Sequence, residues 1–60
     1  MNDELAIWTT KNGTIRAEWN FTNLTNLTIY LNERAVGFNM TITGAMNLVN
    51  ELAGEVVWSS

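Results

Sequence analysis

The chain has 60 residues, which is enough for one small domain and too short for two. It carries six acidic and three basic residues, a net charge of −3, and has no cysteine, histidine or proline. Disulfides, thiolate or imidazole metal ligands and the Ser-His-Asp and Cys-His catalytic arrangements are therefore excluded. A domain of this length buries only about 60% of the surface that its unfolded chain exposes. Without a disulfide or metal, we expect a homo-oligomer, most simply a two-fold dimer.

The charge balance also limits the partners. Three basic residues are too few for the many phosphate contacts that drive nucleic-acid binding, so nucleic acid is a disfavoured partner. No apolar run approaches the roughly 20 residues of a membrane-spanning helix. The first residues, MNDELAIW, lack the basic and apolar regions of a signal peptide. We expect a cytoplasmic protein that needs no cofactor, metal or membrane.

Two strands and a turn are predicted in the first third of the chain. Leu5 to Thr10 is rich in residues that favour strands, and Thr14 to Phe21 alternates apolar and polar side chains. The segment between them, Lys11-Asn12-Gly13, contains the Asn-Gly pair that is typical of hairpin turns. These segments predict an antiparallel pair of strands.

The register of this hairpin decides where Trp8 points. A two-residue Asn12-Gly13 turn places Trp8 opposite Ala17 and inside the protein, whereas a three-residue Lys11-Asn12-Gly13 loop turns it outward beside Arg16. The second register buries two aliphatic side chains, Leu5 and Ile7, and we favour it slightly for that reason. The first keeps an indole out of water and stays an alternative.

A loop and a third strand are expected next. Residues 20–28, NFTNLTNLT, repeat with a period of three, which fits neither a strand nor an α-helix. Asn and Thr favour turns through bonds from side chain to backbone, so a wide loop is predicted. The third strand runs from Leu27 to Asn32 and leads into a tight turn around Glu33-Arg34.

A fourth strand with strict alternation begins at Val36. An even-length loop would pair apolar residues on one face: Leu31 with Val36, Ile29 with Phe38, and Leu27 with Met40. On the other face Tyr30 would lie opposite Gly37, where its ring can cover a bare strand backbone. The pattern predicts that Phe38 points into the core.

At Gly44 the apolar period changes to that of an amphipathic helix, with Thr43 as its N-cap and Gly54 as its stop. The helix is expected to bury four residues: Ala45, Leu48, Val49 and Leu52. Residues 55–59 can form a short C-terminal strand or continue the helix, and we favour the end of the helix at Gly54. The chain is thus predicted to be a single α+β domain, residues 1–60. It comprises a four-stranded antiparallel β-meander followed by one amphipathic helix packed on the apolar sheet face.

Two surfaces are candidate sites. The open sheet face would carry Trp8, Arg16 and Tyr30, the residue types that most often anchor protein interfaces. The simpler alternative is that Trp8 and Arg16 form an exposed cation–π pair. A set of side chains with no expected place in the core forms the candidate oligomer interface: Met46, Ala53 and Trp58.

These features favour a small non-enzymatic protein–protein interaction module acting as a homo-oligomer, whose partner is another protein. In type it resembles the small acidic inhibitors that phages and mobile elements direct against host systems, including anti-CRISPR-like proteins. An alternative is a single-stranded nucleic-acid-binding domain, because aromatic residues on a sheet can stack bases. The order of elements is loosely similar to the sheet-and-helix unit of Whirly-like and transcriptional-coactivator domains. A further alternative is a structural or designed mini-protein without a ligand.

Overall fold

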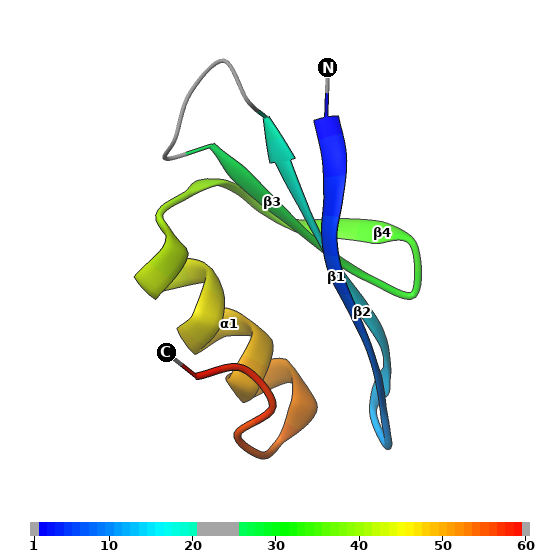
Figure 1. Cartoon of the computed structure of the whole chain (residues 1–60). Helices are drawn as coiled ribbons and strands as arrows, with labels where there is room; N and C mark the ends of the chain where they lie inside the picture. Colours follow the sequence, from blue (N-terminus) through cyan, green and yellow to red (C-terminus); the bar gives the residue numbers. More distant parts are fainter. Residues whose placement is uncertain (1, 21–25, 60) are drawn as a thin grey trace.

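The protein is a four-stranded antiparallel sheet with one helix packed against it, which confirms the predicted α+β class (Figure 1). The computed structural model describes residues 2–20 and 26–59, so the centre of the expected 20–28 loop lies outside the described residues. Neighbouring strands in the sheet are neighbours in the sequence, as in a meander. The elements are β1 (Asn2–Thr10), β2 (Gly13–Asn20), β3 (Leu27–Leu31), β4 (Arg34–Met40) and α1 (Ile42–Ala53).

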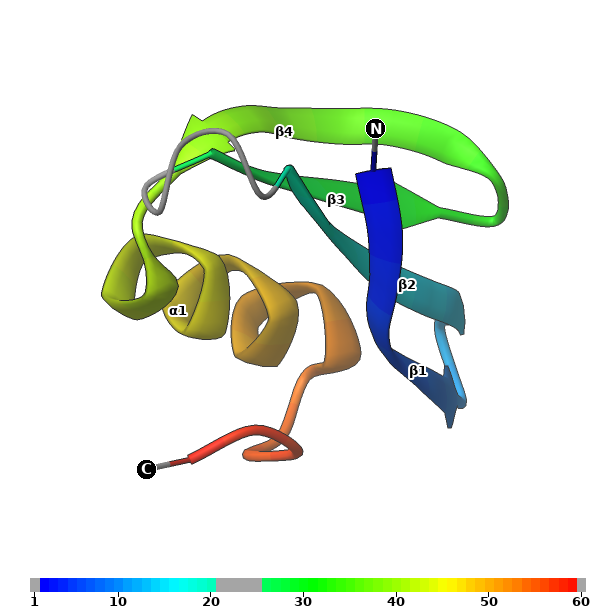
Figure 2. The same cartoon turned by 45° about the horizontal axis from the view of Figure 1, so that its top comes forward.

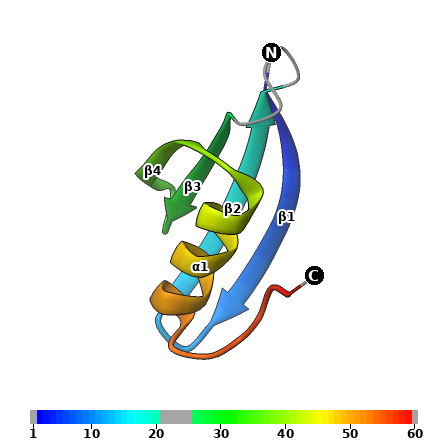
Figure 3. The ribbon, with the colours of Figure 1, turned by 90° about the vertical axis from the view of Figure 1, so that its left-hand side faces the viewer.

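The core lies between one face of the sheet and α1. Figure 3 shows α1 in front of the sheet, with β1 and β4 at its opposite edges. Helix α1 packs on β2, β3 and β4. Among the described residues, seven apolar side chains have no accessible surface: Ile15, Ala17, Leu27, Ile29, Ala45, Val49 and Ala53. The predicted helix residues Leu48 and Leu52 are partly buried and pack against this cluster.

Both ends of α1 are capped. The side chain of Thr41 accepts a hydrogen bond from the Gly44 N–H at 3.1 Å, so the N-cap is Thr41 and the predicted N-cap, Thr43, lies inside the helix. At the other end Gly54 has a φ of 75°, a left-handed conformation that suits glycine, and it ends the helix as predicted. The Nδ2 group of Asn12 also donates to the carbonyl oxygens of Leu52 and Ala53, both at 3.1 Å. The first hairpin therefore caps the helix C-terminus.

Residues 55–59, after the helix, pack back on the molecule. They form no strand, so the possible short C-terminal strand is not present. The side chain of Asn50 holds the segment in place. Its Oδ1 accepts from the N–H groups of Val57 and Trp58 at 2.8 and 3.0 Å, and its Nδ2 donates to the Trp58 carbonyl at 2.8 Å. Figure 2 shows this segment on the helix side of the sheet. There Trp58 packs on Trp8, with ring centroids 5.1 Å apart.

The first hairpin adopts neither predicted register. Its turn consists of Lys11 and Asn12, and Thr10 pairs with Gly13. Trp8 is consequently opposite the buried Ile15 and lies on the core face, so the favoured outward orientation of Trp8 is wrong. Leu5 and Ile7, predicted to be buried, are 42% and 50% exposed.

The position of Gly13 gives a physical reason for this turn. Gly13 has a φ of 131°, which other residues rarely adopt, and a Cβ there would lie 2.8 Å from the side chain of Asn32. Asn32 in turn accepts from the Thr14 N–H through Oδ1 at 3.0 Å, and its own N–H donates to the Thr14 carbonyl at 2.8 Å. This contact between two turns fixes the start of β2.

The second hairpin also differs from the prediction. Its turn residues are Asn32 and Glu33, with φ values of 51° and 67°, as a two-residue turn of type I′ requires. The Leu27–Met40 pair is confirmed, whereas the predicted Leu31–Val36 and Ile29–Phe38 pairs are wrong, because Leu31 pairs with Arg34 and Ile29 with Gly37.

Gly37 explains the shift in β4. It faces α1, where a Cβ would lie 2.7 Å from Cδ2 at the end of the Leu48 side chain, so a larger residue here would require that side chain to move. The residues beside it turn outward: Val36 is 41% and Phe38 65% exposed. Tyr30 consequently pairs with Ala35 instead of lying opposite Gly37.

Candidate interaction surface

The sheet face opposite α1 carries one row of paired residues that crosses all four strands. Ile7 of β1 pairs with Arg16 of β2, Arg16 pairs with Tyr30 of β3, and Tyr30 pairs with Ala35 of β4. Because side chains alternate along a strand, this row points away from the buried row of Ala17 and its neighbours. The register thus gathers one basic, one aromatic and two apolar side chains on the outer face.

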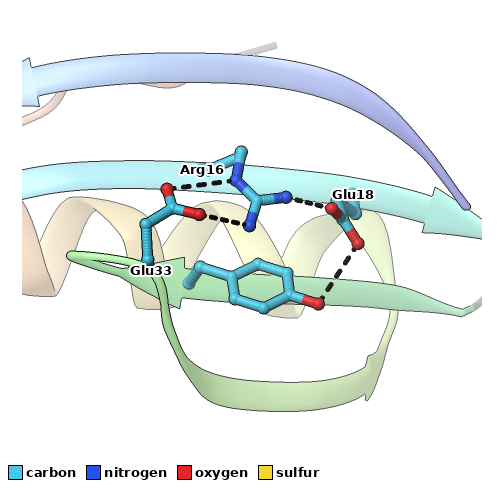
Figure 4. A network of polar contacts seen from close by, with 4 residues as sticks. Arg16, Glu18 and Glu33 are labelled. Atoms are coloured by element: carbon cyan, nitrogen blue, oxygen red, sulfur yellow. Dashed lines mark hydrogen bonds and ion pairs between the residues drawn. The ribbon is translucent and has the colours of Figure 1, made fainter.

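A polar network holds Arg16 and Tyr30 in place (Figure 4). The guanidinium carbon of Arg16 lies 4.0 Å from the centroid of the Tyr30 ring. Its Nη2 and Nε donate to the two carboxylate oxygens of Glu33 at 2.9 and 3.4 Å, and its Nη1 donates to Glu18. The Tyr30 hydroxyl donates to the other oxygen of Glu18 at 3.2 Å. The network connects β2, β3 and the β3–β4 turn.

The charges in this network balance only in part, because one guanidinium faces two carboxylates. The hydrogen bond with Glu33 raises the pKa of Arg16, and Glu18 adds to this effect, while desolvation opposes it. Desolvation raises the pKa of the Tyr30 phenol, and the hydrogen bond to Glu18 raises it further against the opposing charge of Arg16. The phenol therefore stays protonated and acts as a donor. The Arg16 side chain is only 15% exposed, whereas that of Glu33 is 69% exposed and presents its carboxylate to solvent.

Exposed apolar side chains flank the network. Phe38 of β4 is 65% exposed, and its neighbour in sequence Gly37 faces the helix, so the phenyl ring lies on the outer face. Aromatic side chains are enriched where proteins bind one another. We call Arg16, Tyr30, Ala35 and Phe38 the outer patch.

The structure separates the residues of the predicted partner-binding site. Arg16 and Tyr30 do lie together on the outer face, as expected. Trp8 lies on the opposite face, half-buried against Trp58. The alternative of an exposed Trp8–Arg16 cation–π pair is therefore also wrong, and the cation–π partner of Arg16 is Tyr30.

The three residues of the predicted oligomer interface do not form one exposed surface in the chain. Ala53, the last residue of α1, is fully buried on the core side of the helix, which leaves it no surface for a partner. Trp58 packs within the chain against Trp8. Met46 is half-buried on α1, and its part in an interface stays a prediction.

The sequence analysis missed Ile7 and Phe38, the exposed apolar residues of the outer face. Phe38 was assigned to the core from the alternation of its strand, and Ile7 from the favoured three-residue first turn. The signal that could have corrected this is Gly37, because a glycine inside a strand often marks a bulge or a close backbone approach. Glu33 was assigned only to a turn, and its contact with Arg16 needs the two positive φ values that the sequence does not display.

An open pocket of about 440 Å³ lies beside the β3–β4 turn, lined by Leu31, Asn32, Arg34 and Val36. Across residues 2–20 and 26–59, Arg34 forms no salt bridge, and no group of three or more His, Cys, Asp or Glu residues could hold a metal ion. The one helix in that part of the chain is too short to cross a membrane.

Comparisons of the chain with protein-family models, with curated proteins and with solved structures find no match. The functional argument therefore rests on the surface of the molecule.

Proposed function

We propose that the protein is a non-enzymatic interaction module that binds another protein through the outer patch. The observation that carries the proposal is the pair of Arg16 and Tyr30, held by two carboxylates, on the same face as an exposed Phe38. Aromatic residues and arginine supply most of the binding energy at protein interfaces. An inhibitor of a host system can act by covering part of its partner's surface. Such a role requires only a binding face of this kind.

The rigidity of the network favours binding. Ordering a long side chain at an interface costs free energy, which is reduced when the side chain is already held before binding. Arg16 has both carboxylate contacts and the Tyr30 ring in place within the chain, so it loses little further freedom in a complex. The guanidinium can be covered by a partner without being left unpaired.

The charge of the face indicates the chemistry of the partner. The network has one positive and two negative groups, and the whole chain carries −3. The Glu33 carboxylate is the most exposed of these groups. We therefore expect a protein surface with an apolar pocket for Phe38, flanked by Lys or Arg residues that pair with Glu33.

The nucleic-acid alternative is weaker on this face. Trp8, the largest ring expected to stack a base, lies on the core side, and Arg16 is engaged by two carboxylates. Binding of a phosphate backbone needs free basic groups. A salt-dependent titration with a single-stranded oligonucleotide provides the direct check, and tight binding would overturn the protein-partner proposal.

The experiment compares three immobilised forms of the chain: wild type, Phe38→Ser and the control Asn47→Ser on the exposed face of α1. Proteins captured from a lysate by wild type and by Asn47→Ser, but lost with Phe38→Ser, are then purified and titrated with each form. We expect the Phe38→Ser variant to weaken binding of the purified partner by roughly thirtyfold, the scale of an interface hot spot. Equal affinity of all three forms, or no partner that binds after purification, would overturn the proposal.

A further inference from the structure

The two edges of the sheet differ in how well they are protected from pairing with another strand. Edge β4 has two register irregularities, a left-handed residue at Asn39 and the charged Arg34, all of which hinder pairing. Edge β1 has one irregularity, between Glu4 and Ala6. After it, residues 6–10 pair regularly with β2 and include no charge, glycine or proline. Residues 6–10 of edge β1 therefore lack the usual protection.

The register shows which backbone groups of β1 face the open edge. In an antiparallel ladder, hydrogen-bonded and non-hydrogen-bonded pairs alternate, and the pair that closes a two-residue turn is hydrogen bonded. Thr10 and Gly13 close this turn. The backbone N–H and C=O groups of Trp8 therefore bond to β2, whereas those of Ile7 and Thr9 point away from β2. β2 is the one strand neighbour of β1 in the described sheet.

We propose that a second copy of the chain pairs with this edge, with the two β1 strands antiparallel about a two-fold axis at Ile7. The two four-stranded sheets would then form one continuous sheet. This pairing is self-complementary in charge. Beyond the irregularity at Leu5, the end of β1 that carries Asp3 and Glu4 lies in this pairing beside the end of the second copy that carries Lys11. All three side chains are exposed in the single chain.

The same pairing covers exposed apolar surface. Ile7 is 50% and Leu5 42% exposed, and the axis places Ile7 beside its counterpart in the second copy. Cross-strand contacts between β-branched residues stabilise sheets. The C-terminal segment contacts β1 from the helix side through Trp58 and forms no strand pairing with it within the described chain.

The size of the interface sets its expected strength. The chain has 3851 Å² of accessible surface, and a standard interface of about 800 Å² per partner would take about a fifth of it. A single strand edge offers less than that, so we expect a dimer that dissociates in the micromolar range. The inference does not depend on the proposed function, since Phe38 lies on β4 at the opposite edge.

A cysteine trap tests the pairing directly, because the chain contains no cysteine. Hydrogen-bonded partners in an antiparallel pair have Cα atoms about 5.5 Å apart, within the range of about 4.4–6.8 Å that a disulfide spans. Under mild oxidation the Ile7→Cys variant should form a disulfide-linked dimer. The control Val36→Cys, similarly exposed on β4, should stay mostly monomeric. Crosslinking of Val36→Cys alone, or equal slow crosslinking of both variants, would overturn the inference.

Charge-reversal variants test the position of the two-fold axis without an introduced cysteine. The Lys11→Glu variant and the Asp3→Lys/Glu4→Lys variant should each dimerise about tenfold more weakly than wild type, because like charges meet at both ends. A mixture of the two should recover a heterodimer of wild-type affinity, since opposite charges then meet again. Sedimentation measures each affinity, and thermal unfolding checks that each variant is folded. A wild-type chain that stays monomeric at millimolar concentration, or no recovery in the mixture, would contradict the pairing.

The proposed partner-binding patch and the proposed pairing of β1 strands can be tested independently of each other. The Phe38→Ser variant should dimerise as wild type does, and loss of its dimer would place the self-association on the outer patch instead of β1. A monomeric chain that still binds a partner through Phe38 would overturn the β1 pairing alone.

Discussion

The guanidinium of Arg16 stacks on the ring of Tyr30, 4.0 Å from its centroid, and the Tyr30 hydroxyl donates to Glu18, which also binds Arg16. The three groups form a closed set of contacts on the face of the sheet that the helix does not cover. This set distinguishes the outer face from an ordinary solvated sheet surface.

Titration of Tyr30 tests this set of contacts. The pKa of Tyr30 lies above its usual 10.0 in the folded chain, mainly through desolvation and secondarily through Glu18. A raised pKa favours the protonated phenol in the folded state. Its contribution to stability is therefore fully present below the unfolded pKa and is lost as the pH rises through the folded pKa.

Tyr30 is the one tyrosine in the chain, so tyrosinate absorbance reports it alone. We expect the folded protein to titrate at higher pH than the urea-unfolded protein. The Tyr30→Phe variant should lose less stability between neutral pH and the alkaline range than wild type. Equal titration midpoints in the folded and unfolded chain would contradict the hydrogen bond and the desolvation.

The approach of α1 to Gly37 gives a second prediction. A methyl group at this position would overlap the Leu48 side chain at 2.7 Å and the Met40 sulfur at 2.6 Å. We expect Gly37→Ala to lower the free energy of unfolding by about 1–3 kcal/mol, as overpacking usually does. Val36→Ala, at an exposed position beside it, should change stability by less than about 1 kcal/mol. Urea unfolding of both variants measures this, and equal effects would mean that Gly37 does not face the helix.

The Asn12 cap of the helix gives a third prediction. Its side chain donates to two terminal carbonyls of α1, and Asn12→Ala leaves them without this donor. The expected loss is about 1 kcal/mol in the free energy of unfolding. The control Asn47→Ala, at an exposed helix position, should keep or slightly raise stability, since alanine favours helices. An Asn12→Ala variant as stable as wild type would show that water replaces the cap without cost.

Asn50 provides a graded test of the C-terminal segment. Asn50→Asp keeps the acceptor for the Val57 and Trp58 N–H groups but loses the donor to the Trp58 carbonyl, whereas Asn50→Ala loses all three bonds. We expect a loss of about 1–3 kcal/mol for Asn50→Ala and a smaller loss for Asn50→Asp. Detachment of the segment should also change tryptophan fluorescence, because Trp58 leaves Trp8. The reverse order of the two variants would contradict the assigned bonds.

Much of the fold could be predicted from the sequence because β2 and β3 alternate cleanly and Gly54 ends a helical period. The registers could not be predicted, because they depend on turn conformations. The positive φ values of Asn32 and Glu33 shorten the second turn, and Gly13 at 131° shortens the first. The shorter first turn moves β1 by one residue and reverses which of its side chains face the core, whereas in β4 the register irregularities after Ala35 turn Val36 and Phe38 outward.

These strand registers also decide which residues of the candidate site were predicted on the correct face. Arg16 and Tyr30 were predicted on one face because β2 and β3 pair as their patterns indicate. Trp8 was predicted on the wrong face because the face of β1 depends on the first turn, and Phe38 because the register irregularities within β4 interrupt its alternation. In both cases a contact from a distant segment decides the outcome: Trp58 on Trp8, and Leu48 over Gly37.

The most direct measurement of the central claim is an NMR footprint of the chain on addition of a purified partner. The account predicts that the largest shifts fall on the Arg16 Nε–H and on the amides of Tyr30, Ala35 and Phe38, while the exposed helix residue Asn47 is unaffected. Shifts confined to α1 and to residues 55–59, with the outer patch unchanged, would contradict it.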